Sequence, residues 1–299
     1  MNKNVLVLGG SGFLGRRLSF FKPEWHYLSS KDCDLTNSIE TAELFQDIKP
    51  KAVLHLAARV GGIKDNVAHQ ADYYYQNTMI NTNVIHQAYL NGVERLLAAL
   101  STCAYPDKLP IYPFTEENFL QGPPAYTNLS YGYSKRMLHI QCQAYRRQYG
   151  VNYSTFCPTN IYGRGDHFDS LSSHFVAALI TKVAKAKDGD IIKLWGTGAP
   201  LRQQLYVDDL CEIIPMLLEK HNSVEPLIVA PNENLSIQEM TYALISQVHK
   251  NIEVMYNDNL DGQFRKDGSN QKLKELIGNY KFTKFKDGVL KTYNDYTQR

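Results

Sequence analysis

The stretch Val5-Leu-Val-Leu-Gly-Gly-Ser-Gly-Phe-Leu-Gly15 decides the fold of this chain. Its four apolar residues are typical of a buried strand, and the glycines lead into a segment with helical periodicity. Glycines in such a turn let the backbone approach a pyrophosphate, whose charge the helix N-terminus stabilises. The spacing is G-x-x-G-x-x-G rather than the commoner G-x-G-x-x-G, so a glycine turn without a ligand is the alternative interpretation. We expect the turn to bind a dinucleotide through Gly9, Gly10, Ser11, Gly12, Phe13, Leu14 and Gly15.

The same strand-then-helix pattern repeats along the first half of the chain. Amphipathic stretches alternate with apolar runs. The amphipathic stretches are at residues 39–48, 72–91 and 130–149, and the apolar runs are at 25–28, 52–57, 95–100 and 152–156. This alternation is typical of a parallel sheet whose strands are connected by helices. We predict an α/β protein in which residues 1–160 form a Rossmann-type doubly wound parallel sheet.

Beyond residue 160 the alternation loosens. We predict a smaller C-terminal α/β substrate-binding lobe over residues 161–299, of which parts of about 203–230 pack back on the first domain. Its expected elements are a polar loop, a helix, a hairpin-like stretch, a second helix and a polar tail, at residues 163–172, 174–186, 195–198, 207–219 and from 250 onward.

The composition excludes several classes of protein. With 43% hydrophobic residues, 21% charged residues and a net charge of +2 without a basic block, the chain predicts no nucleic-acid binding. Its apolar runs are too short to span a bilayer. The five cysteines form no C-x-x-C pair, so we expect no metal site, no disulfide framework and a reducing, cytoplasmic compartment. The first strand begins at Val5, which leaves no room for a signal peptide.

The end of the second strand distinguishes NADP from NAD. An acidic residue usually holds the ribose 2′-hydroxyl of NAD there, whereas this chain has Ser29, Ser30 and Lys31. Small hydroxyls and a cation suit a 2′-phosphate, so we predict NADP as the cofactor. Arg16 and Arg17 are further candidate ligands of the phosphate, although all these cations can instead be solvated surface charges.

Other residues near strand ends complete the expected cofactor site. Asp34 and Leu35 are expected to contact the adenine, although Asp34 can instead cap the following helix, as can Thr36, Asn37 or Ser38. Ala57, at the end of the third strand, is also assigned to the cofactor.

Ser101, Tyr131 and Lys135 are the expected machinery for moving a hydride to or from a carbinol carbon. Tyr131 and Lys135 match Tyr-x-x-x-Lys on a predicted helix, where this spacing puts both side chains on one face. A nearby ammonium lowers the pKa of a phenol from its usual ~10, and a serine hydroxyl can hydrogen-bond a substrate oxygen. The position of this pair distinguishes it, because it follows the strand that leads into Ser101. The alternative interpretation is that Tyr131 and Lys135 are residues of a solvated helix face without a catalytic role. The pattern alone is weak, since it recurs at Tyr27/Lys31 and Tyr280/Lys284.

Cys103 suggests a second chemistry, the abstraction and return of protons at carbons next to a carbonyl. A lone cysteine is more often a small packing residue, but the loop places this one beside Ser101. Its candidate partner is His174, although a lone histidine is usually a surface or cap residue. Lys182 lies eight residues later on roughly the same side of the predicted helix and can offer a cation to a phosphate.

Six motifs carry a resemblance to a known family. They are Leu100-Ser-Thr-Cys-Ala-Tyr-Pro-Asp, Gly122-Pro-Pro, Tyr131-Gly-Tyr-Ser-Lys-Arg-Met, Pro158-Thr-Asn-Ile-Tyr-Gly, Trp195-Gly-Thr-Gly and Asp261-Gly-Gln-Phe-Arg-Lys. Together they closely resemble the GDP-L-fucose synthases, which are extended short-chain dehydrogenases/reductases, and the resemblance covers nearly the whole chain. The glycine loop and Tyr-x-x-x-Lys are shared by the superfamily, whereas Ser-Thr-Cys with His174 and the Trp195 segment are more specific.

The resemblance implies a two-stage reaction on GDP-4-keto-6-deoxy-D-mannose. Cys103 would be the base and His174 the acid that invert C3 and C5. NADPH would then reduce C4, with Tyr131 giving the proton, Ser101 polarising the carbonyl and Lys135 holding the nicotinamide ribose.

The resemblance also implies binding residues and a partner. Pro158, Thr159 and Asn160 would flank the nicotinamide and the sugar nucleotide, and Trp195 would line the nucleotide pocket. The diphosphate charge would be offset by Lys182, where the family commonly has Arg, and by Arg202 and Lys266. The family implies a homodimer, in which the helices at 72–91 and 130–149 form a four-helix bundle.

Two other functions remain open from the sequence. The first is a dedicated 4-keto reductase of another GDP-sugar, such as a 6-deoxy-heptose, with Cys103 and His174 as vestiges. It is suggested by Arg164-Gly-Asp, where the family leads us to expect a proline-containing run. The second is a non-enzymatic NADP-binding sensor, which has little reason to keep the whole catalytic set together.

Overall fold

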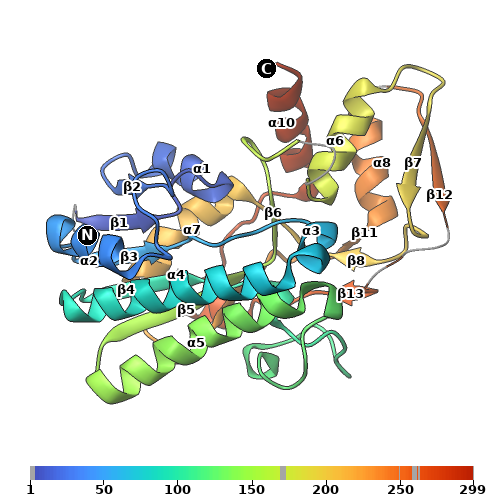
Figure 1. The fold of residues 1–299 in the computed structure, drawn as a ribbon. Helices are drawn as coiled ribbons and strands as arrows, with labels where there is room; N and C mark the ends of the chain where they lie inside the picture. The colour runs from blue at the N-terminus through green and yellow to red at the C-terminus, as the bar shows by residue number, and fades with distance from the viewer. Residues whose placement is uncertain (1–3, 169–172, 249, 258–260, 262, 299) are drawn as a thin grey trace.

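A computed structural model describes residues 4–168, 173–248, 250–257, 261 and 263–298 (Figure 1). Its centre is a six-stranded sheet in the order β10-β5-β4-β3-β1-β2, in which every neighbouring pair is parallel. This confirms the predicted α/β fold with a Rossmann-type sheet. The strands are β1 (Val5–Leu8), β2 (His26–Leu28), β3 (Ala52–His55), β4 (Arg95–Ala99), β5 (Asn152–Pro158) and β10 (Leu227–Val229).

Alternate residues of β1 face opposite layers of helices. Val5 and Val7 lie in a core shared with α1 (Phe13–Phe21), α7 (Val207–Lys220) and α9 (Gln271–Ile277). Leu6 and Leu8 lie in the core shared with α2 (Ser38–Ile48), α4 (Gln70–Leu90) and α5 (Leu129–Tyr149). Because both faces of the strand are covered, it is a continuous apolar run without polar alternation. Figure 1 shows α4 and α5 side by side along this second face.

The order of the strands fixes where a ligand can bind. From β1 the sheet extends to β2 on one side and to β3 on the other. Open α/β sheets bind ligands beyond the carboxyl ends of their strands at such a switch point. The glycine loop leaves β1 at this edge, and the chain after β4 arrives there with Ser101.

The second half of the chain builds a smaller lobe and also completes the sheet. After β5 the chain leaves through β6 (Asn160–Tyr162), which pairs with β9 (Gln204–Tyr206), and it returns through α7 and β10. The smaller lobe packs three helices beside short strands, as the right of Figure 1 shows. Its elements are α6 (Phe175–Lys185), β7 (Ile191–Trp195), β8 (Leu201–Arg202), β11 (Leu235–Ser236), α8 (Ile237–Val248), β12 (Glu253–Asn257), β13 (Arg265–Lys266) and α10 (Phe285–Thr297).

Three features differ from the expectations. The stretch around Trp195 does not form a hairpin, because β7, which ends at Trp195, pairs in parallel with β12 rather than with the chain that follows it; Gly196 and Gly198 after it have positive φ. The Lys/Asn/Asp-rich segment expected after residue 250 contributes to a core, because Phe285 and Val289 of α10 are buried in the smaller lobe. A short helix that the sequence pattern did not indicate, α3 (Ile63–Ala68), lies between β3 and α4.

Local capping agrees with the sequence more closely. The Asn37 side chain accepts hydrogen bonds from the backbone N–H groups of Ile39 and Glu40, so Asn37 caps α2. The expected polar loop at 163–172 falls partly outside the described residues, which omit 169–172. The loop before α5 contains the short 3-10 turns η1 (Thr102–Ala104), η2 (Glu116–Asn118) and η3 (Tyr126–Asn128).

Candidate active site

Ser101, Tyr131 and Lys135 meet at the carboxyl end of β4. The Ser101 hydroxyl accepts a hydrogen bond from the backbone N–H of Cys103, 3.2 Å away, and so caps η1. The Lys135 ammonium, one helical turn after Tyr131 on α5, donates to the carbonyl of Ala99 at 2.8 Å. Tyr131 in turn has a side-chain hydrogen bond with Ser101. The strand end and the helix therefore hold the three side chains in one place, as their spacing predicted.

The acidity of Tyr131 differs from the expectation. Burial raises the pKa of the phenol above its ordinary value, and the neighbouring Cys103 adds to this, while the hydrogen bond with Ser101 opposes it. Burial lowers the pKa of Lys135 to about 8. This direction is opposite to the predicted lowering, because the loss of hydration is the largest influence on the phenol. A phenol that stays protonated is suited to donate a proton rather than to accept one.

Cys103 has a cationic partner from the smaller lobe. The Lys266 ammonium lies 3.3 Å from the Cys103 sulfur. Burial alone would raise the pKa of this thiol, but the charge of Lys266 and hydrogen bonds from Ser101 and Lys266 outweigh burial, so the pKa is lowered. Cys103 is partly exposed, whereas the other four cysteines are buried. A lowered thiol pKa next to lysine is the environment of a reactive cysteine.

His174 stands near the same lysine. It is the residue directly before α6, where its side chain makes no capping hydrogen bond. Desolvation lowers the pKa of the imidazole, and the charges of Lys266 and His167 lower it further. One cation therefore favours both the thiolate of Cys103 and the neutral form of His174.

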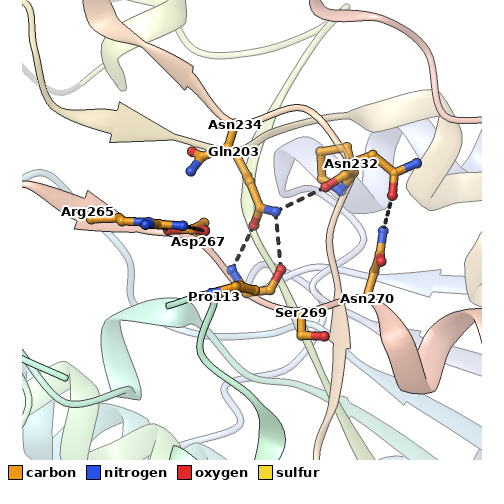
Figure 2. A pocket seen from close by; sticks show the side chains of 10 residues that line it. Pro113, Gln203, Asn232, Asn234, Arg265, Asp267, Ser269 and Asn270 are labelled. Atoms are coloured by element: carbon orange, nitrogen blue, oxygen red, sulfur yellow. Dashed lines mark hydrogen bonds and ion pairs between the residues drawn. The ribbon is translucent and has the colours of Figure 1, made fainter. Parts of the chain in front are cut away.

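A polar pocket lies beside β13, lined by residues on either side of Lys266 (Figure 2). Successive side chains of a strand point to opposite faces, so Lys266 reaches Cys103 while Arg265 and Asp267 line a pocket of about 300 Å³. Gln203 fixes the backbone just after β13. Its side-chain amide accepts a hydrogen bond from the N–H of Gly268 at 2.8 Å and donates one to the carbonyl of Gly268 at 3.1 Å. Figure 2 shows these bonds and the Arg265–Asp267 ion pair.

The other residues expected to bind substrate lie apart from this cluster. The Lys182 ammonium donates to the carbonyl of Lys193, and the Arg202 guanidinium donates to the carbonyl of Leu201 at 2.7 Å. Trp195 ends β7 with 66% of its surface exposed. Within the described ranges no direct contact joins these three side chains to Cys103 or Tyr131.

The glycine loop forms a close-fitting cradle. A methyl group on Gly15 would overlap the carbonyl oxygen of Gly9 and lie 2.7 Å from the Cα of Gly10. Gly9 has a φ of +92° and abuts the backbone of Ala57 at the end of β3. The absence of side chains at these positions allows α1 to begin directly against the strand. The N-terminus of α1 then faces the space where a pyrophosphate binds in this type of fold.

The two arginines after the loop have different partners. Arg17 forms an ion pair with Asp208 of α7 at 2.5 Å, so it is engaged within the fold. Arg16 donates to the carbonyls of Ser11 and Gly165 and links the loop to the second half of the chain. Neither contact involves the end of β2.

The remaining cofactor candidates lie along the same edge. Lys31 is exposed after β2, and Asp34 accepts hydrogen bonds from the N–H and hydroxyl of Thr36. Leu35 packs against the core shared with α2 and α4. Pro158 ends β5, and Asn160 begins β6.

Several site residues could not be found from the sequence pattern. Tyr73 is fully buried, donates to Asp65 at 2.5 Å and packs edge-on against Tyr131 with 6.4 Å between ring centroids. Lys64 lies with its ammonium 5.6 Å from the ring centroid of Trp195. The charge of His167 lowers the pKa of His174. The sequence gives no indication of this beyond the position of His167, seven residues before His174.

Two negative findings concern the residues that the structure describes. None of their histidine, cysteine, aspartate and glutamate side chains form a group of three or more that could hold a metal ion. None of their helices combines the length and apolarity needed to cross a membrane.

A Rossmann sheet that carries a glycine cradle and a serine, tyrosine and lysine set at the same edge defines the class of short-chain dehydrogenases/reductases. Residues 5–230 match the NAD dependent epimerase/dehydratase family. The chain belongs to this family, and within it to the GDP-L-fucose synthases.

Relatives and solved structures support this placement. A probable GDP-L-fucose synthase of Drosophila melanogaster is 35% identical, over 96% of this chain and 95% of the relative. The structure of a GDP-L-fucose synthetase from Naegleria fowleri bound to NADP is similar with a TM-score of 0.92 and 29% identity, over 100% of this chain and 94% of the other. A GDP-D-glycero-L-gluco-heptose synthase from Campylobacter jejuni is similar with a TM-score of 0.90 and 25% identity, over 100% and 99%.

Proposed function

We propose that the protein is an NADPH-dependent 3,5-epimerase and 4-reductase that converts GDP-4-keto-6-deoxy-D-mannose to GDP-L-fucose. The observation that carries this proposal is the Lys266–Cys103 pair, 3.3 Å apart, next to Ser101 and Tyr131. A reductase needs the serine, tyrosine and lysine, but it has no use for a thiol with a lowered pKa. An enzyme that also inverts the carbons next to the carbonyl needs such a thiol as its base.

In the first stage the Cys103 thiolate removes a proton from C3 or C5. The C4 carbonyl takes up the electron pair as an enolate, whose oxygen Ser101 and Tyr131 stabilise as hydrogen-bond donors. His174, when protonated, returns a proton to the opposite face of the carbon. Positioned acids and bases of this kind contribute about 10²–10⁴-fold to such steps.

In the second stage the C4 ketone becomes an alcohol. NADPH, when bound on the glycine cradle, supplies the hydride. The protonated phenol of Tyr131 donates its proton to the C4 oxygen, and Ser101 orients that oxygen. Lys135 supports the phenol after it has lost its proton and is placed to hold the nicotinamide ribose.

The preference for NADP rests on the residues after β2. Lys31 is exposed beside Ser29 and Ser30, while Arg17 is occupied by Asp208. We expect Lys31→Ala to weaken the binding of NADPH and to leave the binding of NADH unchanged, in fluorescence titrations of both cofactors. Equal loss for both would assign Lys31 to the fold rather than to the 2′-phosphate.

A homodimer through α4 and α5 is part of the proposal. These helices pack on each other, and exposed apolar side chains recur at helical spacing on one face of α5, namely Tyr133, Met137 and Ile140, while Tyr75 and Leu90 are exposed on α4. A second copy of the same pair would bury this face in a four-helix bundle. The five unpaired cysteines support a reducing, cytoplasmic compartment.

One other function has a specific observation in its favour. The similarity to a heptose synthase from Campylobacter jejuni supports a reductase of another GDP-4-keto sugar. Incubation with GDP-4-keto-6-deoxy-D-mannose and NADPH separates the two. Under our proposal NMR shows a product with inverted C3 and C5. A C4-reduced product with both centres unchanged supports the alternative, and NADPH that is not consumed contradicts our proposal.

A further inference from the structure

We propose that Lys64 is a substrate-binding residue that holds the diphosphate of the sugar nucleotide. Without substrate, the Lys64 ammonium lies over the Trp195 ring. When the base of the sugar nucleotide stacks on that ring, Lys64 moves from the ring to the diphosphate. This inference rests on the proposed function, because it requires a nucleoside diphosphate-sugar as the substrate.

The geometry places Lys64 between the two parts of the molecule. Lys64 is the second residue of α3, which begins directly after Gly61 and Gly62. Its ammonium is 5.6 Å from the centroid of the Trp195 ring, which is within the range of a cation–π contact. Trp195 belongs to β7 of the smaller lobe, so this contact spans the two parts. In Figure 1, α3 lies at the end of α4 that faces β8 and β13.

The backbone of α3 is fixed relative to the reacting centre. The Asn66 amide donates to the carbonyls of Gly61 and Gly62 at 2.9 and 3.1 Å. Asp65 accepts the hydroxyl of buried Tyr73, whose ring packs edge-on against Tyr131. The long side chain of Lys64 can therefore move from the indole to a phosphate while its helix stays in register with Tyr131.

The charge distribution favours Lys64 as the residue that binds the diphosphate. The diphosphate carries negative charge on both phosphates, and the cations first assigned to it have other partners. Lys266 pairs with Cys103, and Lys182 and Arg202 donate to backbone carbonyls. Within the described part of the chain, by contrast, Lys64 forms no ion pair with a carboxylate. An exposed cation beside an exposed indole fits a ligand with an aromatic base and a phosphate.

A structural role is the alternative that the experiment must exclude. If Lys64 only latches the smaller lobe to α3, its loss would weaken every ligand that needs the two parts together. If it binds phosphate, its loss would weaken only ligands that carry phosphate. Guanosine and GDP share the base and differ in the phosphates, so they distinguish the two roles.

The experiment follows the fluorescence of Trp195 during titration of the intact enzyme with GDP and with guanosine. The chain has two tryptophans, and Trp25 is only 9% exposed, so quenching reports on Trp195. We expect Lys64→Met to weaken GDP about tenfold or more and to leave guanosine unchanged, because a charge-assisted hydrogen bond is lost. Lys64→Arg should retain most of the affinity, and Lys220→Met, on the exposed end of α7, should bind both as the wild type does.

The outcomes separate this inference from the proposed function. Equal affinity of the wild type and Lys64→Met for GDP, or equal loss for GDP and guanosine, overturns the role of Lys64 while the enzyme's turnover stands. A wild type that binds no GDP overturns the proposed function, and this inference falls with it. In turnover, Lys64→Met should raise KM for the sugar nucleotide with little change in kcat and none in KM for NADPH.

Discussion

The Lys266 ammonium lies 3.3 Å from the Cys103 sulfur, although 163 positions separate the two residues in the chain. Cys103 belongs to the turn after β4, and Lys266 to β13 of the smaller lobe. The protonation state of the proposed base is therefore set by a residue from the other part of the molecule. A molecule in which β13 is displaced would keep its reductase residues and lose the activated thiol.

Removal of this cation should make the thiol less acidic. In Lys266→Met burial is opposed only by the hydrogen bond from Ser101, so the pKa of Cys103 should rise. The pH dependence of alkylation by iodoacetamide measures this directly, because the other four cysteines are buried. Cys103→Ser gives the background rate, and Lys266→Arg should restore the acidic midpoint. An unchanged midpoint in Lys266→Met would show that the pair is a contact without electrostatic effect.

The same cation predicts a shift in the pH profile of epimerisation. The exchange of substrate protons needs Cys103 as thiolate and His174 as imidazolium, so its rate should be bell-shaped. The pKa of Cys103 is lowered by Lys266 against burial, while that of His174 is lowered by burial and then by Lys266. Without the cation both values rise, and the whole bell should move to higher pH in Lys266→Met. Movement of a single limb would mean that Lys266 acts on one of the two groups only.

The glycine cradle predicts graded effects on cofactor binding. Gly15→Ala places a methyl group against the Gly9 carbonyl, where only backbone could give way, whereas the methyl of Gly12→Ala lies 3.2 Å from the same atom. We expect Gly15→Ala to weaken NADPH at least about tenfold, a free-energy change of about 1.4 kcal/mol, and Gly12→Ala to have a smaller effect. NADPH fluorescence titration measures both. Similar affinities of the wild type and Gly15→Ala would place the cofactor elsewhere.

The outer face of α5 predicts the oligomeric state. Met137 and Ile140 are exposed on this face, and a charge at each should prevent a second copy from packing on it. The double variant Met137→Glu/Ile140→Glu should be a folded monomer by light scattering after size-exclusion chromatography. Ile39→Glu, at an apolar position on α2 that is more exposed than either, is the control and should keep the mass of the wild type. A monomeric wild type would contradict the dimer.

The parts of the fold that could be predicted depend on local patterns. The run from Val5 to Gly15 indicated both the buried strand and the turn, and the four-residue spacing of Tyr131 and Lys135 indicated a shared helix face. The parallel pairing of β7 with β12 could not be predicted, because the two strands are far apart in sequence and the glycines after Trp195 suggested a hairpin.

The same limit applies to the site. Lys266 was expected to face the diphosphate, and its contact with Cys103 depends on the position of β13, which Gln203 and Gly268 fix. The shift of the Tyr131 pKa was predicted with the wrong sign, because the sequence indicates a neighbouring ammonium but not the degree of burial. The contact of Lys64 with Trp195 joins two lobes and leaves no mark in either local pattern.

The most direct test of the account is proton exchange without reduction. The protein is incubated with GDP-4-keto-6-deoxy-D-mannose in D₂O in the absence of NADPH, and deuterium at C3 and C5 is measured by NMR. We predict incorporation at both carbons by the wild type, and severe loss in Cys103→Ser, which should still reduce the pre-epimerised ketone when NADPH is added. A wild type that incorporates no deuterium at either carbon would contradict the epimerase assignment, whatever its activity as a reductase.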